Sequence, residues 1–113
     1  MSYKYSRGLN MSDIATKTKI APNLDVREPP MFRVVYLNDN ATSVEFVIES
    51  LIKHFEYSEK TAEKLTLNIH ESGSAVVAVL PYEIAEQKGV EVTVDARSSG
   101  FPLQIKLEPE SSN

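Results

Sequence analysis

The fold of this chain is decided by one stretch of sequence, Pro29-Pro30-Met31-Phe32-Arg33-Val34-Val35-Tyr36-Leu37-Asn38-Asp39-Asn40. Its middle part, Met31–Leu37, is a run of apolar and β-branched residues that predicts a central strand. The two prolines before it disfavour a helix. Three polar residues follow the strand directly, Asn38, Asp39 and Asn40. Their amide and carboxylate groups can all point at one place, and an acidic corner without glycine or lysine suits an ammonium group better than a phosphate.

Helical spacing begins directly after this corner. Thr42 starts a first helix with Glu45 at capping-box spacing, and apolar residues recur at three and four positions up to Phe55. Ser58 caps a second helix, which Gly73 ends. The remaining sequence predicts a strand over Ala75–Leu80, a third helix over Glu83–Ser98 and a strand over 102–107. Gly89 and several β-branched residues weaken the third helix, and that segment also fits a strand.

The order β-α-α-β-α-β predicts an α+β fold, a small three-stranded antiparallel sheet with three helices on one face. Residues 1–28 have few apolar residues and no sustained period, so they predict a flexible N-terminal extension before a single domain at 29–113. The extension carries five basic and three acidic groups, whereas residues 29–113 carry seven basic and thirteen acidic groups. An acidic domain argues against a nucleic-acid partner, whose phosphates require lysine and arginine.

Composition excludes several further classes of protein. The sequence has no cysteine, so neither a disulfide framework nor a thiolate metal site is possible, and we expect no metal and no cofactor. No apolar run approaches the roughly 18 residues of a membrane span, and the N-terminus lacks the apolar core of a signal peptide. We therefore expect a cytoplasmic protein without a membrane partner.

Catalysis has little support in the sequence. Two histidines and no cysteine leave serine or threonine as a nucleophile, and no nucleophile elbow, P-loop, His-Glu-x-x-His or dinucleotide glycine pattern occurs. Asp39 and His70 could in principle act together as a general base for hydrolysis. We do not expect an enzyme.

The polar corner allows two interpretations. It could be only a turn that caps the following helix. Alternatively, a carboxylate beside two amides could hold an α-ammonium group, whose three donors form charge-assisted hydrogen bonds. His70, near Gly73 at the end of the second helix, is a candidate for the rim of such a pocket, although a lone helical histidine is usually an ordinary surface or core residue. His54 is expected on a solvated face and receives no role.

Four segments resemble the ClpS family in their order and spacing, namely residues 29–40, Glu45-Phe46-Val47, Ile69-His70-Glu71-Ser72-Gly73 and Glu83-Ile84-Ala85-Glu86-Gln87-Lys88. These are adaptors of the Clp protease that recognise N-end-rule substrates. The resemblance covers residues 29–108. It implies an adaptor that binds N-terminal hydrophobic residues (N-degrons) and delivers their proteins to the Clp AAA+ ATPase of the ClpA or ClpC type, in bacterial cytoplasm or in a plastid.

The resemblance also implies roles for three groups of residues. The α-amino group of the substrate is expected to bind Asn38, Asp39, Asn40, Thr42 and His70. A first residue of Leu, Phe, Tyr or Trp is expected in a hydrophobic pocket walled by Val44, Val47, Thr66, Ile69 and Leu103. The N-terminal domain of the ATPase is expected to dock on Glu83 and Lys88, and residues 1–28 are expected to help hand over the substrate.

The chain departs from the family pattern around this pocket. Asn40 stands where aspartate is usual, Val44 and Thr66 each replace a methionine, and Ala41 and Ser43 replace the usual tyrosine and proline. These differences predict a slightly more polar pocket, a changed ranking of N-terminal residues and better tolerance of Ile or Val. An alternative role is a regulator that docks on the ATPase and alters its substrate choice without binding N-degrons.

Overall fold

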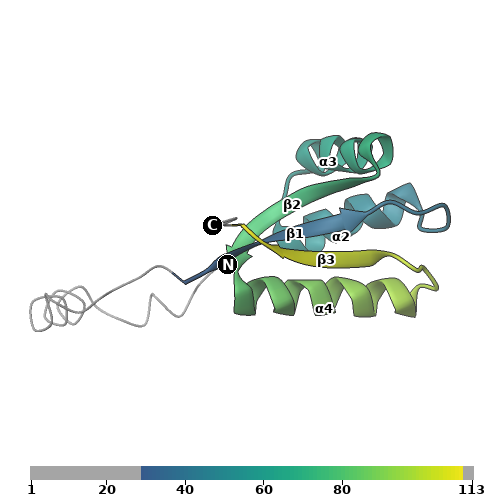
Figure 1. Cartoon of the computed structure of the whole chain (residues 1–113). Helices are drawn as coiled ribbons and strands as arrows, with labels where there is room; N and C mark the ends of the chain where they lie inside the picture. The colour runs from purple at the N-terminus through teal and green to yellow at the C-terminus, as the bar shows by residue number, and fades with distance from the viewer. Residues whose placement is uncertain (1–28, 111–113) are drawn as a thin grey trace, which may run out of the picture.

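Strand β1 (Met31–Leu37) is the central strand of a three-stranded antiparallel sheet, with β2 (Ser74–Pro81) on one side and β3 (Gln104–Pro109) on the other. Helices α2 (Val44–Phe55) and α3 (Glu59–Ser72) connect β1 to β2, and α4 (Tyr82–Ser98) connects β2 to β3 (Figure 1). The computed structural model describes residues 29–110, so the predicted extension at 1–28 lies outside the described residues. The predicted α+β class and order of elements are confirmed.

The helices bury one face of the sheet. Because successive strand residues point to opposite faces, Val34 and Tyr36 of β1 lie together on the helix side, and both are fully buried in the core. The Tyr36 hydroxyl lies 2.8 Å from Oγ of Ser50 on α2, which gives both buried polar groups a partner. Burial raises the pKa of Tyr36, although the Ser50 hydrogen bond partly offsets this rise.

Strand β2 contains a β-bulge. Its register against β1 shifts between Val34 and Val35, which pair with Ala78 and Val76 and leave Val77 unpaired. Val77 is buried in the core, and its carbonyl accepts a hydrogen bond from the hydroxyl of Tyr57. The bulge thereby fixes the loop between α2 and α3 against the sheet.

The helix boundaries follow the sequence closely, with one correction at the site. The N-cap of α2 is Ser43 rather than Thr42, because the Ser43 Oγ accepts the backbone N–H of Phe46 at 3.0 Å. Ser58 caps α3 as predicted, and Gly73 ends it in the left-handed conformation with φ of 88°. The segment that could have been a strand is the helix α4. Within residues 29–110 no helix has the length and apolar character needed to cross a membrane.

Strand β3 begins later than predicted, at Gln104 rather than residue 102. The guanidinium of Arg97 donates to the carbonyls of Phe101 and Leu103, at 3.0 and 2.8 Å, so these carbonyls bind a side chain rather than a neighbouring strand. Leu103 itself is buried in the core.

The sequence predicted His54 on a solvated face, and this prediction is wrong. Its side chain is only 10% exposed, and its Nε2 lies 2.6 Å from Oδ2 of Asp95 on α4. The second ring nitrogen, Nδ1, lies 3.5 Å from Oε1 of Glu91. His54 therefore connects α2 to α4 through two carboxylates.

Candidate functional site

The polar corner at the end of β1 lies against the end of α3. The backbone N–H of Asn38 donates to the carbonyl of Gly73 at 2.9 Å, which joins the end of β1 directly to the end of α3. Because Gly73 closes α3, the last turn of that helix brings His70 to the corner. Two parts of the site that the sequence predicted separately are therefore neighbours.

A cavity of about 250 Å³ lies at this junction. Its polar lining comprises all five residues predicted for the amino group, Asn38, Asp39, Asn40, Thr42 and His70. Four of the five predicted hydrophobic wall residues also line it, namely Val44, Val47, Thr66 and Ile69. The fifth, Leu103, is 1% exposed in the core and is not part of the lining.

The carboxylate of Asp39 organises the corner. Its Oδ1 accepts the backbone N–H groups of Ala41 and Thr42, at 2.7 and 2.6 Å, and its Oδ2 accepts the Thr42 hydroxyl at 2.8 Å. A carboxylate has about four acceptor positions, so one position on Oδ2 is left for a further donor. Desolvation raises the pKa of Asp39, but these hydrogen bonds and the positive charge of Arg97 outweigh it, and the pKa is lowered overall. Asp39 is therefore ionised at neutral pH and supplies a negative charge to the cavity.

The apolar wall is formed by α2 and α3. Val47 and Ile69 are almost completely buried, at 7% and 3% exposed, whereas Val44 at the start of α2 is 55% exposed. Thr66 is 7% exposed, and its hydroxyl donates to the carbonyl of Ala62 at 2.7 Å. The donor of Thr66 is thus bound within its own helix. The expected increase in the polarity of the pocket is consequently smaller than a free hydroxyl would give.

The two residues predicted for ATPase docking lie on α4. Glu83 is exposed in its first turn, and Nζ of Lys88 lies 4.0 Å from Oε1 of Glu91. No residue of α4 is among those that line the cavity at the polar corner. The predicted docking residues and the predicted amino-group site therefore occupy separate parts of the described structure.

Sequence reasoning missed Arg97. Its hydrogen bonds hold the segment that carries Leu103, and its charge acts on Asp39. A basic residue in the last turn of a helix is common, so the sequence offered no signal for either contact. Among residues 29–110 no group of three or more histidine or acidic side chains is arranged to hold a metal ion.

A family model described as "ATP-dependent Clp protease adaptor protein ClpS" matches residues 27–106 of this sequence. The chain belongs to the ClpS family. It is 36% identical to the ClpS adapter protein of Myxococcus xanthus over 98 residues, which cover 87% of this chain and 92% of that relative. It is 40% identical to ClpS 2 of Agrobacterium fabrum, over 87% of this chain and 93% of the relative.

A solved ClpS structure shares the fold. Agrobacterium tumefaciens ClpS2 bound to L-phenylalaninamide matches with a TM-score of 0.71 and 41% sequence identity, over 74% of this chain and 100% of that one. The resemblance that the motifs indicated is thus confirmed over most of the folded region. As a ClpS-family member, the chain is an adaptor of the ATP-dependent Clp protease and not an enzyme.

Proposed function

We propose that this ClpS-family adaptor binds the free N-terminal residue of a substrate protein in the cavity at the end of β1. The observation that carries the proposal is that one cavity combines an ionised carboxylate with an apolar wall. L-phenylalaninamide, the compound bound to the Agrobacterium relative, has both a free α-amino group and an apolar side chain. An N-terminal hydrophobic residue presents the same two groups.

The amino group is proposed to bind the polar end of the cavity. Oδ2 of Asp39 has one acceptor position left, and the side chains of Asn38 and His70 each offer a further acceptor. Three acceptors match the three donors of an α-ammonium group. Asn40 lines the same region as a neutral residue, and Thr42 keeps the Asp39 carboxylate in place.

The side chain of Leu, Phe, Tyr or Trp is proposed to enter the apolar part. In another protein, a cavity of about 150 Å³ is enough to hold benzene, so about 250 Å³ has room for a phenyl ring. Val47, Thr66 and Ile69 supply the buried wall, and Val44 lies at the exposed mouth. Leu103 is proposed only as support behind this wall, because it lies in the core.

Delivery is proposed to use α4. Glu83 and Lys88 present one charge of each sign to the N-terminal domain of a Clp AAA+ ATPase of the ClpA or ClpC type. Since these residues lie apart from the cavity, both partners can be bound at once. The absence of cysteine agrees with a reducing compartment, and we place the protein in the cytoplasm or in a plastid.

A pair of peptides tests the proposal. A labelled peptide that begins with Phe is titrated with the full chain, and the same peptide with an acetylated amine serves as the matched control. We expect saturable binding of the free amine and no measurable binding of the acetylated form, because acetylation removes the charge and two donors. Equal binding of both peptides contradicts the proposal. Absence of peptide binding together with retained ATPase binding supports the regulator instead.

A further inference from the structure

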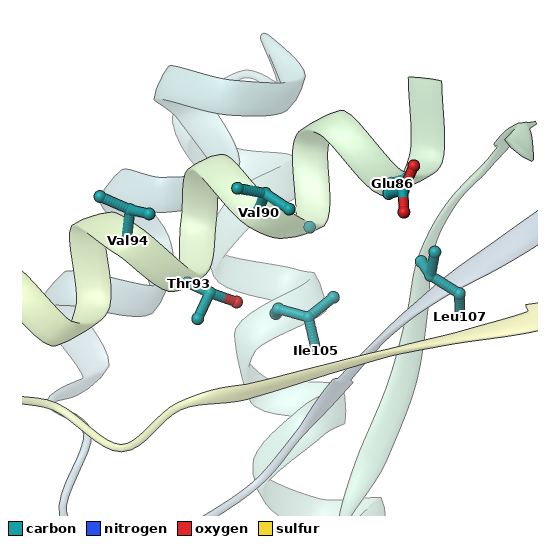
Figure 2. Close-up of a pocket in the computed structure, with 7 residues that line it drawn as sticks. Glu86, Val90, Thr93, Val94, Ile105 and Leu107 are labelled. Atoms are coloured by element: carbon teal, nitrogen blue, oxygen red, sulfur yellow. The ribbon is translucent and has the colours of Figure 1, made fainter. Parts of the chain in front are cut away.

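A second apolar groove, of about 290 Å³, lies between α4 and β3. Figure 2 shows Ile105 and Leu107 rising from β3 toward the helix, with Val90 and Val94 along α4. The two valines are 56% and 58% exposed, which is high for β-branched apolar side chains. The groove continues into a neighbouring hollow that shares Ile105 and reaches the end of α4.

The groove adjoins an edge of the sheet without a partner strand. β3 pairs with β1 on one side, and no strand within residues 29–110 pairs with its other side. α4 packs close to this strand at Gly89, where even a Cβ would be in ordinary van der Waals contact with Cγ2 of Ile105, at 3.6 Å. An extended segment that joins an open sheet edge gains main-chain hydrogen bonds, and it buries every second side chain. The groove and the edge thus favour the same kind of occupant.

We propose that residues 19–28 of the same chain bind in this groove as an additional extended segment beside β3. Ile20, Leu24 and Val26 all stand at even positions, so an extended chain presents them on one side. Residues 20–26 span about 20 Å when extended, and α4 from Glu86 to Arg97 spans about 16 Å. The segment is therefore long enough to follow the groove.

The place where the described chain begins supports this occupant. Pro29 and Pro30 line a hollow with Tyr82 at the start of α4, and the rings of Phe32 and Tyr82 are 5.0 Å apart. The Tyr82 hydroxyl donates to Oε2 of Glu86, which lines the groove, at 3.2 Å. The described chain thus begins beside the start of α4, where Tyr82 contacts the groove residue Glu86. Since β1 starts where β3 ends, the segment runs parallel to β3 and turns back into β1.

Charge also agrees with the proposal. Residues 19–28 carry two basic groups, Lys19 and Arg27, and two acidic groups, Asp25 and Glu28, so the proposed segment has no net charge and suits an apolar groove. Among the residues that line the groove, Glu86 is the only one with a charged side chain, and the rest of the lining is almost entirely apolar. The docked segment covers the open edge and holds the N-terminal region beside α4. Docking of this segment in the groove is independent of the proposed N-degron binding.

Disulfide trapping in the full chain tests this inference, because the natural sequence has no cysteine. One variant combines Leu24→Cys with Val90→Cys in the groove. The control combines Leu24→Cys with Leu67→Cys on α3, a residue that is 56% exposed, as Val90 is. In a glutathione buffer we expect the intramolecular disulfide to be favoured at least about tenfold in the groove pair, since docking raises the effective concentration of the two thiols. Equal formation in both variants overturns the proposal, and so does a concentration-dependent disulfide between two copies.

A second measurement introduces no cysteine and leaves residues 19–28 unchanged. Val90→Lys combined with Val94→Lys changes only exposed side chains, so the fold is expected to persist. In amide NMR spectra of the full chain, we expect the signals of Leu24 and Val26 to move toward random-coil positions in this variant. Signals that do not change on substitution show that the groove is not their binding site.

Discussion

At the scale of single residues, Asp39 has two tasks that compete for the same carboxylate. Three hydrogen bonds from Ala41 and Thr42 fix the corner, and one acceptor position on Oδ2 is left for a ligand. The charge that attracts an ammonium group is thus held by the loop that it shapes. Replacing Asp39 is expected to affect both the loop and the ligand.

Asp39→Asn is expected to weaken binding of a Phe-initiated peptide by roughly 1–3 kcal/mol, the scale of a hydrogen bond to a charged group. This corresponds to about a 5- to 150-fold higher Kd, measurable by fluorescence anisotropy. Glu45→Gln, which removes an exposed carboxylate on α2 outside the cavity lining, is the matched control. Equal affinities in the wild type and Asp39→Asn would remove Asp39 from the proposed site.

Val44 is expected to set the tolerance for branched N-terminal residues. Val44→Met places a longer side chain at the exposed mouth of the cavity and narrows it. Peptides that begin with Ile or Val, which branch near the backbone, should therefore lose affinity relative to Leu and Phe. Such pocket changes are worth roughly 1–3 kcal/mol per methylene, and titration of peptides that differ only in the first residue measures them. Val90→Met on α4, where the valine is 56% exposed against 55% for Val44, is the control. An unchanged ranking with Val44→Met contradicts this role.

At the scale of elements, α4 serves several surfaces. Its N-terminal half carries Glu83 and Lys88, its middle lines the groove, and its last turn holds Arg97 against the segment before β3. His54 and Asp95 connect it to α2. Changes on its outer face should therefore separate docking from peptide binding.

Charge reversal of Glu83→Lys with Lys88→Glu is expected to abolish binding to the N-terminal domain of the Clp ATPase and to leave peptide affinity unchanged. The physical reason is that like charges then face each other across the proposed interface. Glu63→Lys with Lys64→Glu, an exposed pair on α3, is the control. Pull-down and anisotropy measure the two activities separately, and loss of both together would indicate misfolding.

The sequence predicted the elements well because their signals are local. Helical spacing, the Ser58 cap and the Gly73 terminus all lie within a few residues of what they determine. Thr42 and Ser43 are both competent caps, and only the hydrogen bond from Thr42 to Asp39 decides between them. All nine residues that line the cavity were among those predicted, the polar corner and His70 from their own chemistry, and Thr42 and the apolar wall through the resemblance, whereas the predicted wall residue Leu103 lies in the core. Arg97 and His54 act through contacts between distant segments, which no local pattern reports.

At the scale of the whole molecule, the domain is acidic, and several of its carboxylates have a lowered pKa. Hydrogen bonds from His54 and Lys53 lower the pKa of Asp95, and a hydrogen bond from Lys106 lowers that of Glu108. A group whose pKa is lower in the folded state stabilises the fold above its unfolded pKa of about 4, and this contribution disappears as the pH falls through the folded value. Acid should therefore destabilise the protein.

We expect the melting temperature to fall between about pH 5 and pH 2, the window set by lowered carboxylate pKa values. Asp95→Asn should lower the melting temperature at pH 7, and the difference from the wild type should narrow as the pH falls, because protonation removes the same charge. Glu63→Gln, at an exposed position on α3, is the control. A difference for Asp95→Asn that stays constant down to pH 2 contradicts the assignment.

The hydrogen bond from the Asn38 amide to the Gly73 carbonyl has a consequence for cooperativity. This hydrogen bond joins two segments of the cavity that are far apart along the chain. A fluctuation that separates them therefore disrupts the cavity without unfolding the sheet. Hydrogen–deuterium exchange at the Asn38 amide therefore reports the fraction of molecules in which the surface is assembled. A ligand that binds only the assembled form must slow that exchange in proportion to its occupancy. The exchange rate of this one backbone amide thus measures the fraction of molecules that are able to bind.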